Sequence, residues 1–350
     1  MSYTAVDLFC GVGGLTHGLH QAGIHVAAGI DADPSCKFAY ETNTPNSRFI
    51  EKKIEDVTVK ELRDLYPEGN PRVLVGCAPC QPYSSYNRTE SKENQWDPLR
   101  RFAGLIEELK PDVVSMENVT RLKHFRNGEL LEEFLETLRS NNYYIHQQDV
   151  DCAQYNIPQL RKRLVILASR LGEIKLPPPI VTSTENYSTV ASIIKELPKI
   201  SAGQADPNDK LHYASRLSDL NMRRMKASKA GGTWHDWPEE LQAACHKKHS
   251  GRFYSSVYGR MEWTKPAPTI TTQCYGFGNG RFGHPEQDRA ISLREAALLQ
   301  TFPPDYQFIA EDEELNISAT SRHIGNAVPV ALGRVIGEAI VEHLNEHIGK

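Results

Sequence analysis

In Asp7-Leu8-Phe9-Cys10-Gly11-Val12-Gly13-Gly14-Leu15, an apolar run passes through a glycine-rich turn into the start of a helical pattern. The apolar residues from Ala5 to Phe9 predict a buried strand, and the spacing from Leu15 to Ala22 predicts a helix. Glycines at such a turn let a ligand approach the backbone closely. The stretch therefore indicates an α/β protein that binds a ligand at its first turn.

Strands and helices continue to alternate through the first half of the chain. The further strand candidates are Val26–Ile30, Val73–Val75, Val113–Met116 and Leu164–Ala168, and the further helix candidates are Leu99–Leu109 and Glu129–Arg139. This alternation predicts a doubly wound, mostly parallel sheet with helices on both faces.

The triplet Pro177-Pro178-Pro179 ends the alternating pattern and is the best candidate for a domain boundary. The sequence beyond it is irregular until helical spacing resumes over Leu293–Gln300 and again over Val328–His343. We therefore expect a larger domain made of residues 1–172 and 296–350, interrupted by a smaller, irregular domain at residues 173–295.

Composition places the chain among ordinary globular proteins. Its 350 residues are 24% charged and 39% hydrophobic, which allows a sizeable core. The longest apolar stretch, Val328–Val341, is interrupted by Arg334 and Glu338, so we expect no membrane helix. No leader pattern opens the chain, and the seven cysteines show no disulfide framework, which predicts reduced thiols and a cytoplasmic protein.

Charge is distributed unevenly along the chain. The net charge is −4, yet residues 210–265 carry +6 and the remainder carries −10. A basic segment on an acidic body suits a protein that holds a polyanion with one part only. A solvated basic face without a ligand is the alternative interpretation.

The glycine turn lacks one glycine of the dinucleotide fingerprint, because Thr16 occupies the position of the last one. It therefore favours a nucleoside ligand without a pyrophosphate, such as S-adenosylmethionine, over a turn that binds nothing. Asp31 follows about 20 residues later, at the position where an acid meets ribose hydroxyls. Asp56 follows a third short segment and is placed to accept a hydrogen bond from an adenine amino group.

Two further groups follow strand candidates and would meet at one edge of the sheet, and a third precedes the strand candidate Leu164–Ala168. Cys80 comes after Val73–Gly76 in Ala78-Pro79-Cys80-Gln81-Pro82-Tyr83-Ser84, and Glu117 follows Val113–Met116 in Glu117-Asn118-Val119. The third group is Gln159-Leu160-Arg161-Lys162-Arg163. Taken singly, the cysteine could be a core residue and the Glu-Asn pair a helix cap.

In this order and spacing, these motifs resemble those of the DNA cytosine-5 methyltransferases of bacterial restriction-modification systems. The resemblance extends from Asp7 to the closing segment Ile324-Gly325-Asn326-Ala327-Val328-Pro329. It implies the methyltransferase fold that binds S-adenosylmethionine and methyl transfer to C5 of a flipped-out cytosine in duplex DNA. Cytosine C5 is a poor nucleophile, and addition of the Cys80 thiolate to C6 would activate it.

The resemblance also assigns roles to individual residues. Glu117 would engage N3 and the exocyclic amine of the cytosine, Arg163 would hold its O2, and Arg161 would order the site near the thiolate. The cofactor-binding residues would be Asp7, Phe9, Gly11, Gly13, Gly14, Asp31, Asp56, Val57, Pro79 and Asn326.

The chain departs from the family pattern at several of these positions. The ribose acid is usually Glu and is Asp31 here, and the next position, often aromatic, is Ala32. Where the family usually has Gly-Pro-Pro-Cys, this chain has Cys77-Ala78-Pro79-Cys80. The resulting Cys-x-x-Cys elsewhere indicates redox chemistry, but no thioredoxin-sized unit surrounds it.

The DNA-contacting residues are expected in the basic segment and beside the nucleophile. The candidates are Gln81, Ser84, Arg223, Arg224, Lys247, Lys248 and Arg252. The polar segment Ser84–Trp96 is expected to close over the flipped base, with a plain surface loop as the alternative. Cys245-His246-x-x-His249 suggests zinc, but no fourth ligand stands nearby, so we expect no metal.

The sequence therefore predicts a monomeric bacterial DNA methyltransferase that acts on duplex DNA. A cognate restriction endonuclease that acts separately is left open as a partner. The nearest alternative is the branch of the same family that methylates transfer RNA. A nicotinamide dehydrogenase would explain the glycine turn but not Cys80, Glu117 and Arg163 together. A non-catalytic DNA-binding regulator would need a disabled nucleophile, and Cys80 is intact.

Overall fold

The computed structural model describes residues 3–79, 97–248, 251 and 255–348. Within them the chain divides into two compact units. Unit 1 contains residues 1–155, 162–180 and 327–350, and unit 2 contains residues 156–161 and 181–326. The division passes between Ile180 and Val181, directly after the three prolines. The compact units are defined by contacts and not by function. The predicted domain boundaries at 172/173 and 295/296 therefore stay a prediction.

Unit 1 is built on a sheet of seven strands among the described residues, in the order β3-β2-β1-β4-β5-β8-β6. All neighbours are parallel except that β8 is antiparallel to β5 and β6. This arrangement confirms the predicted doubly wound, mostly parallel sheet. The strands are β1 (Thr4–Leu8), β2 (His25–Asp31), β3 (Arg48–Glu51), β4 (Arg72–Gly76), β5 (Val113–Val119), β6 (Tyr144–Asp151) and β8 (Lys162–Ser169).

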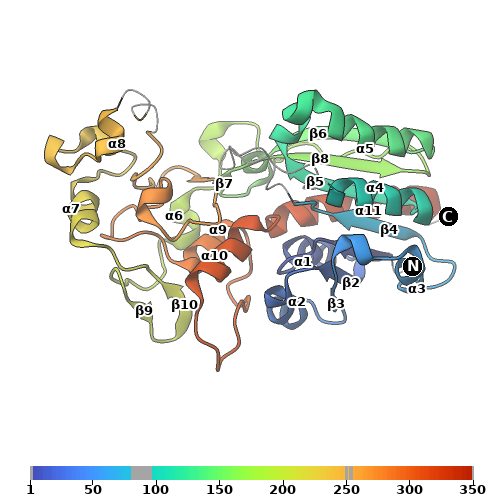
Figure 1. Cartoon of the computed structure of the whole chain (residues 1–350), viewed down its shortest axis with the longest axis horizontal. Coiled ribbons are helices and arrows are strands. Elements are labelled where there is room, and N and C mark those ends of the chain that lie inside the picture. The colour runs from blue at the N-terminus through green and yellow to red at the C-terminus, as the bar shows by residue number, and fades with distance from the viewer. Residues whose placement is uncertain (1–2, 80–96, 249–250, 252–254, 349–350) are drawn as a thin grey trace. The chain divides into compact units, whose positions relative to one another are not determined.

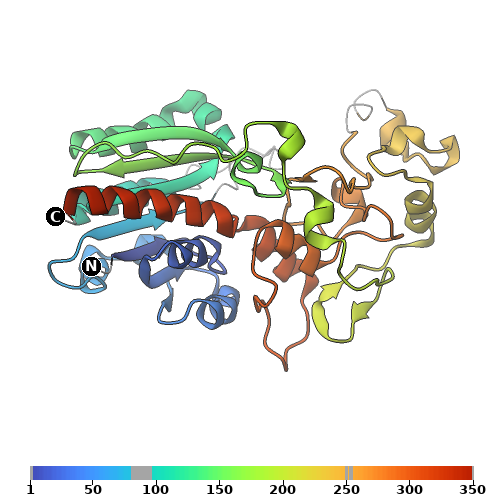
Figure 2. The same ribbon diagram turned by 180° about the vertical axis from the view of Figure 1, so that it is seen from behind.

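Helices cover both faces of this sheet (Figures 1 and 2). One face packs against apolar side chains of α3, α4 and α5, with Leu74, Met116 and Ile166 contributed by the strands. The other face carries α1 and α11, and Figure 2 shows α11 running along it. The helices of unit 1 are α1 (Gly14–Gln21), α2 (Lys37–Asn43), α3 (Val59–Asp64), α4 (Asp97–Leu109), α5 (Glu129–Ser140) and α11 (Val330–Ile348).

Glycine allows α1 and α11 to approach each other closely. A Cβ added at Gly18 would lie 2.4 Å from the carbonyl oxygen of Val330 and 2.5 Å from the backbone nitrogen of Arg334. Both of these atoms belong to backbone, which cannot rotate away. The interface therefore requires glycine at position 18, although glycine lowers the intrinsic stability of a helix.

We predict that Gly18→Ala lowers the free energy of unfolding by about 1–3 kcal/mol, as overpacking does. Gly104→Ala in α4 is the matched control, because its Cβ would meet only the Arg101 side chain at 3.8 Å. That control should stabilise the protein by about 0.5–1 kcal/mol through helix propensity. Urea denaturation of both variants checks the opposite signs, and equal stabilisation by both would show that α1 and α11 are farther apart.

The stretch Ile317–Ile348 is long and apolar enough by composition to cross a membrane, but 67% of its most apolar window is buried inside the protein. It comprises α10 (Ile317–Asn326) and α11, and Leu332, Ile336 and Ile340 of α11 are buried. We therefore interpret the stretch as core helices.

Unit 2 has little regular structure. Its strands form two pairs, β7 (Gln159–Leu160) with β11 (Ala267–Pro268), and β9 (Ala205–Asp206) with β10 (Asp209–Tyr213). Its helices are α6 (Val190–Ile194), α7 (Asp219–Ala227), α8 (Ala244–Lys247), α9 (Leu293–Leu299) and α10. An apolar cluster around Trp234, Trp237 and Phe277 gives part of this unit a core.

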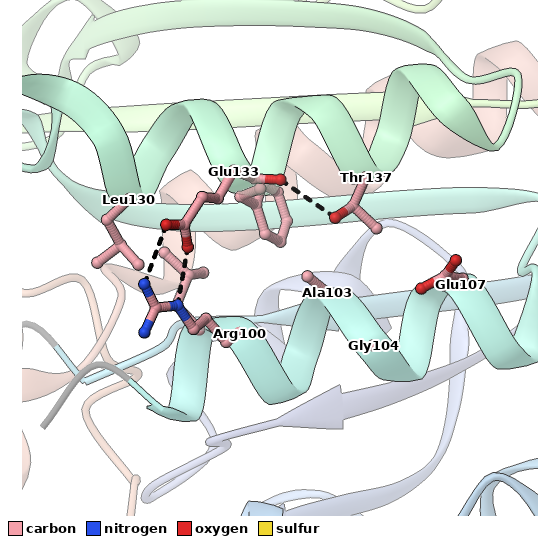
Figure 3. A pocket seen from close by; sticks show the side chains of 9 residues that line it. Arg100, Ala103, Gly104, Glu107, Leu130, Glu133 and Thr137 are labelled. Carbon is pink, nitrogen blue, oxygen red and sulfur yellow. Dashed lines mark hydrogen bonds and ion pairs between the residues drawn. The ribbon is translucent and has the colours of Figure 1, made fainter. Parts of the chain in front are cut away.

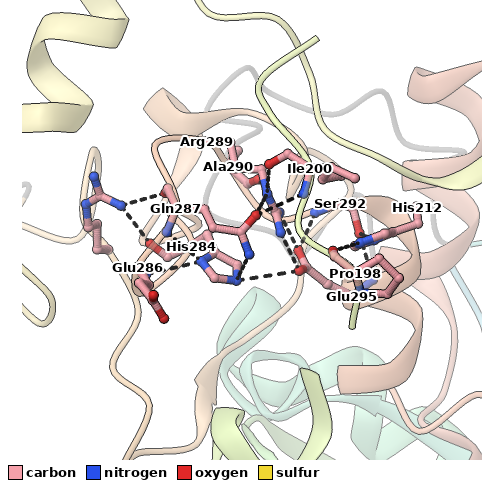
Figure 4. Close-up of polar contacts among 11 residues, drawn as sticks. Pro198, Ile200, His212, His284, Glu286, Gln287, Arg289, Ala290, Ser292 and Glu295 are labelled. Atoms are coloured by element: carbon pink, nitrogen blue, oxygen red, sulfur yellow. Dashed lines mark hydrogen bonds and ion pairs between the residues drawn. The ribbon is translucent and has the colours of Figure 1, made fainter. Parts of the chain in front are cut away.

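Buried polar side chains link the irregular segments of unit 2 (Figure 4). Arg289 donates to both carboxylate oxygens of Glu295, at 2.7 and 2.8 Å, and neither side chain is accessible to solvent. Glu295 also accepts from the backbone N–H of Ser292 at 2.7 Å. Burial alone would raise the pKa of Glu295, but the Arg289 hydrogen bond and charge hold it below its usual value.

The imidazole of His284 is held neutral in the same network. Its Nδ1 accepts from the backbone N–H groups of Glu286 and Gln287, at 3.1 and 2.9 Å. Burial lowers the pKa of His284 to about 4. A proton on Nδ1 would break both hydrogen bonds, so the folded protein resists protonation at this site.

This arrangement predicts a loss of stability in mild acid. The unfolded chain takes up a proton on His284 near pH 6.5 and the folded chain only near pH 4, so stability falls as the pH drops between these values. From pH 7 to pH 5 the contribution of His284 to this loss is about 2 kcal/mol, whereas the raised pKa of Asp7 acts in the opposite direction. Urea denaturation of the native protein and of His284→Asn at both pH values isolates the contribution of His284. His284→Asn keeps an acceptor without the titration and should flatten the slope, whereas an unchanged slope would contradict this assignment.

Candidate active site

The glycine-rich turn joins β1 to α1 through backbone conformations that favour glycine. Gly11 and Gly13 have φ angles of 51° and 89°, and Gly13 is the N-cap of α1. Among the described residues, no atom lies within 4 Å of a Cβ added at Gly11, so this part of the chain leaves space beside the turn. Phe9 also has a positive φ, of 61°, and its backbone N–H donates to the carbonyl of Ile30 at 2.7 Å.

Asp31 lies at the end of β2 and holds this turn. One carboxylate oxygen accepts from the backbone N–H of Gly11 at 2.9 Å, and the other accepts from that of Asp33, also at 2.9 Å. The shorter side chain found here in place of the family's Glu thus ties β2 to the glycine turn. Burial raises the pKa of Asp31, and these backbone hydrogen bonds oppose the rise.

Asp7 lies beneath the turn and is almost inaccessible to solvent. Its Oδ2 accepts from the Thr16 hydroxyl at 2.7 Å, and Thr16 is in contact with the hydroxyl of Tyr40 at 3.2 Å. Burial, together with the charge of Asp31, raises the pKa of Asp7 to about 7. Among the described residues, no group donates a hydrogen bond to its Oδ1.

The turn fits S-adenosylmethionine better than a phosphate-bearing cofactor. The carboxyl groups of Asp7 and Asp31 stand beside it, and no Lys or Arg occurs from Asp7 to Gln21. Carboxylates complement an ammonium, a sulfonium and ribose hydroxyls, whereas they repel phosphate. The unpartnered oxygen of Asp7 and the open space at Gly11 agree with such a ligand.

The other predicted cofactor residues are described one by one. Asp56 ends a short 3-10 helix, Ile54–Asp56, and is exposed, whereas Val57 is buried. Pro79 is exposed just after β4. Asn326 is the exposed last residue of α10 and belongs to unit 2. The contacts of all four with a cofactor stay predictions.

Glu117 is the buried carboxyl group at the carboxyl end of β5. Its side chain is only 3% exposed, and Arg163 Nε of β8 lies 2.9 Å from Oε1. The antiparallel pairing of β5 with β8 sets Val119 opposite Arg163, which brings the guanidinium to this strand end. The ion pair lacks the alignment of a hydrogen bond, and among the described residues Oε1 accepts none.

Two residues that sequence reasoning did not assign to the site also contact this strand end. The Cys77 thiol donates to Oε2 of Glu117 at 2.7 Å. Asn118 donates from Nδ2 to the carbonyl of Ala78 at 3.2 Å and so ties β5 to the segment before Cys80. Asn118 directly follows Glu117 in the sequence, and Cys77 comes three residues before Cys80. This closeness in sequence was the signal that could have assigned both residues to the site.

Arg161 lies in unit 2, where it is buried and connects distant segments. Its guanidinium donates to the carbonyl oxygens of Ile270 and Gly325, at 3.0 and 3.3 Å. Nearby, Gln159 donates to Leu299 O and accepts from Ile270 N–H. These contacts make Arg161 a positioning residue within unit 2, and an effect on the thiolate stays a prediction.

The predicted nucleophile and several predicted DNA contacts lie outside the described residues. They are Cys80, Gln81, Ser84 and Arg252, together with the Ser84–Trp96 segment. Of the described candidates, Arg223, Lys247 and Lys248 are exposed, and Lys247 forms a 3.2 Å ion pair with Glu239.

Arg224 is buried and has a structural role. Its Nε donates to Leu241 O at 2.8 Å, and its guanidinium lies 5.5 Å from the Trp237 ring centroid and 5.3 Å from that of Tyr258. We therefore leave Arg224 out of the proposed DNA-contacting set. In the possible zinc motif, His246 stacks on Trp234 with ring centroids 4.2 Å apart, and His249 lies outside the described residues.

A groove of about 220 Å³ between α4 and α5 contains none of the predicted site residues (Figure 3). Arg100 donates to both carboxylate oxygens of Glu133, at 2.8 and 2.9 Å, and Glu107 also lines the groove. Because the predicted site residues lie elsewhere, we leave the groove out of the candidate site.

Comparison with solved structures supports the fold. A protein of E. coli assigned as a DNA modification methyltransferase encoded within a prophage gives a TM-score of 0.75 at 20% identity, covering 98% of this chain and all of that one. A DNMT2 variant from Spodoptera frugiperda gives 0.65 at 16% identity, covering 97% of this chain and all of that one. At these identities the two likenesses show the fold alone.

Sequence comparison identifies the family. Residues 3–342 match the family described as C-5 cytosine-specific DNA methylase. The Type II methylase M.HgiDII of Herpetosiphon aurantiacus is 56% identical over 97% of this chain and 95% of that protein. The Type II methyltransferase M1.HphI of Haemophilus parahaemolyticus is 29% identical over 98% of this chain and 87% of that protein. The chain therefore belongs to the C-5 cytosine-specific DNA methylase family, as its motifs predicted.

Proposed function

We propose that this enzyme methylates C5 of a cytosine that has been flipped out of a specific duplex DNA sequence, with Cys80 as the nucleophile. The observation that carries the proposal is Glu117, a buried carboxyl group at the end of the strand next to β4, whose Oε1 lies 2.9 Å from Arg163 Nε and accepts no hydrogen bond among the described residues. Cys80 follows β4 in the sequence by four residues.

The proposed reaction uses each group once. With Glu117 protonated, the Cys80 thiolate adds to C6 while Glu117 gives its proton to N3, so the pyrimidine ring becomes electron-rich at C5. Bound S-adenosylmethionine would supply the methyl group to C5 as an electrophile and leave as S-adenosylhomocysteine. A water molecule then takes the proton from C5, the Cys80 thiolate is expelled, and the N3 proton returns to Glu117, which restores the aromatic ring. Arg163, whose Nε lies 2.9 Å from Oε1 of Glu117, would contact the cytosine O2.

Base flipping follows from the chemistry of addition. C5 and C6 of a stacked cytosine cannot be reached from both faces, so the target base must leave the duplex. We assign DNA binding to exposed basic residues of unit 2, including Arg223, Lys247 and Lys248. Phosphate contacts of this kind would weaken steeply as salt rises.

We further propose that the enzyme acts as a monomer in the bacterial cytoplasm, where its DNA substrate lies. The relatives M.HgiDII and M1.HphI are Type II methylases, which supports a modification role. A restriction endonuclease of the same specificity would then act separately, as a second protein.

Nucleoside mass spectrometry tests the proposed reaction. Plasmid DNA is incubated with the protein and S-adenosylmethionine, beside a transfer RNA sample, and bisulfite sequencing then locates the modified cytosines. New 5-methylcytosine in the DNA at one sequence supports the proposal. Methylation of the RNA alone would refute it in favour of the RNA-modifying branch of the family, and product in neither sample would refute both.

A further inference from the structure

Cys77 lies opposite Glu117 because of the register of the central strands. In the parallel pair of β4 and β5, Gly76 pairs with Met116, so the next residues along the two strands are Cys77 and Glu117. The backbone N–H of Cys77 donates to the carbonyl of Leu8 at 3.3 Å, which continues the sheet by one residue beyond β4. The register of the sheet therefore sets residue 77 beside Glu117.

The Glu117 carboxylate is contacted from two sides. The Cys77 thiol donates to Oε2 at 2.7 Å, and Arg163 Nε lies 2.9 Å from Oε1. The terminal torsion of a glutamate is broad, so a buried carboxylate with one partner can rotate its plane. Two partners on different strands fix that plane.

We propose that Cys77 is a positioning residue for Glu117, whose thiol fixes the carboxylate plane before the cytosine enters. The proposal rests on the proposed function, because it assigns Cys77 to the group that protonates N3. It concerns the thiol of Cys77 as a hydrogen-bond donor and involves no disulfide.

A thiol suits this role because it is a weak hydrogen-bond donor. It can hold Oε2 in the free enzyme and release that oxygen to the exocyclic amine of the entering base at little cost. A Lys or Arg at position 77 would bind the carboxylate more strongly and compete with the substrate. Among the described residues, the charged or titratable groups recorded at the Glu117 carboxylate are Arg163 and Cys77.

A packing role for Cys77 makes a different prediction. Cys77 is only partly buried, so a residue that merely fills space there should be replaceable by alanine at little cost. A donor to Glu117 should be replaceable by serine and not by alanine. The alanine and serine variants therefore separate the two roles.

Steady-state kinetics on duplex DNA provide the first test. Cys77→Ala is expected to lower kcat about tenfold, because a misplaced catalytic group reacts slowly, with KM for DNA and for S-adenosylmethionine unchanged. Cys77→Ser, which keeps a donor, should recover most of the loss. Wild-type kcat in Cys77→Ala, or an equal loss in both variants, would overturn the proposal.

Alkylation of the thiol tests the contact without any catalysis. In the native protein the Glu117 carboxylate opposes formation of the Cys77 thiolate, so iodoacetamide should label Cys77 slowly. Glu117→Gln removes that charge and should raise the labelling rate about tenfold, measured by peptide mass spectrometry. The exposed thiol of Cys245 is the internal control and should react equally in both proteins.

The kinetic test and the alkylation test together distinguish failure of the proposed function from failure of the positioning role of Cys77. Absence of 5-methylcytosine with the native enzyme would refute the proposed function, and the labelling rate would still decide the contact. An equal Cys77 labelling rate in native protein and Glu117→Gln would refute the positioning role even where methylation is normal.

Discussion

Glu117→Gln is expected to lower kcat for DNA methylation by about 10²–10⁴-fold, the contribution typical of a positioned general acid. Glutamine preserves the size of the side chain and cannot donate a proton to N3. The carboxylate is 3% exposed and next to Arg163, so bulk water is poorly placed to replace it. The thiolate would then add to a ring that cannot take up the developing charge.

Kinetics with duplex DNA and a labelled methyl donor measure this effect. Glu129→Gln is the matched control, because Glu129 is exposed at the first residue of α5 and should keep full activity. Binding of S-adenosylmethionine, followed by calorimetry, should be unchanged in Glu117→Gln. If that variant retained most of the native kcat, Glu117 would not be the proton donor.

Arg289→Met is expected to lower the free energy of unfolding by about 3–5 kcal/mol, because it leaves the Glu295 carboxylate buried without its partner. Arg289 and Glu295 are both inaccessible to solvent, and Glu295 also contacts the N-terminus of α9 through Ser292. The loss should be largest in unit 2, where segments far apart in sequence depend on this network (Figure 4).

Urea denaturation followed by tryptophan fluorescence measures this loss, since three of the four tryptophans belong to unit 2. Arg139→Met is the control, because the ion pairs of Arg139 with Glu132 and Glu136 are exposed and such pairs contribute about 0–1 kcal/mol. The double variant Arg289→Met, Glu295→Leu should be more stable than Arg289→Met. A single variant as stable as the control would mean that the network is hydrated.

The core of unit 1 was predictable because buried parallel strands have continuous apolar sequences. The runs at Val73–Val75 and Val113–Met116 became β4 and β5, with bounds that differ by a few residues. Strand β6, Tyr144–Asp151, was missed because it lies at the edge of the sheet and carries polar residues such as His146 and Gln148. Edge strands need no apolar run.

Unit 2 was less predictable because side chains, rather than periodic backbone, connect its segments. Arg260 donates to the carbonyl oxygens of Ser228, Met225 and His284. No local sequence pattern predicts these contacts. The burial of Arg224 was likewise not predictable from the net charge of residues 210–265, because a count of basic residues does not distinguish a buried guanidinium from an exposed one.

The candidate site was predictable where chemistry and strand ends coincide. Glu117 was expected at the edge of the sheet where Cys80 follows its strand, and the pairing of β5 with β8 brings Arg163 Nε within 2.9 Å of its Oε1. The donation from Cys77 to Glu117 was not expected, because it depends on the register between β4 and β5. The hydrogen bond from the Gly11 backbone N–H to the Asp31 carboxylate was also not predictable from the sequence, because it depends on the fold of the turn.

Trapping of the covalent intermediate tests the central claim most directly. Duplex DNA carrying 5-fluorocytosine at the target is incubated with the enzyme and S-adenosylmethionine, because fluorine at C5 cannot leave as a proton does and elimination stops. Mass spectrometry should then find a protein–DNA adduct on the Cys80 peptide with the native chain and none with Cys80→Ser. An adduct on another residue, or 5-methylcytosine formed on ordinary DNA by Cys80→Ser at the native rate, would contradict this account.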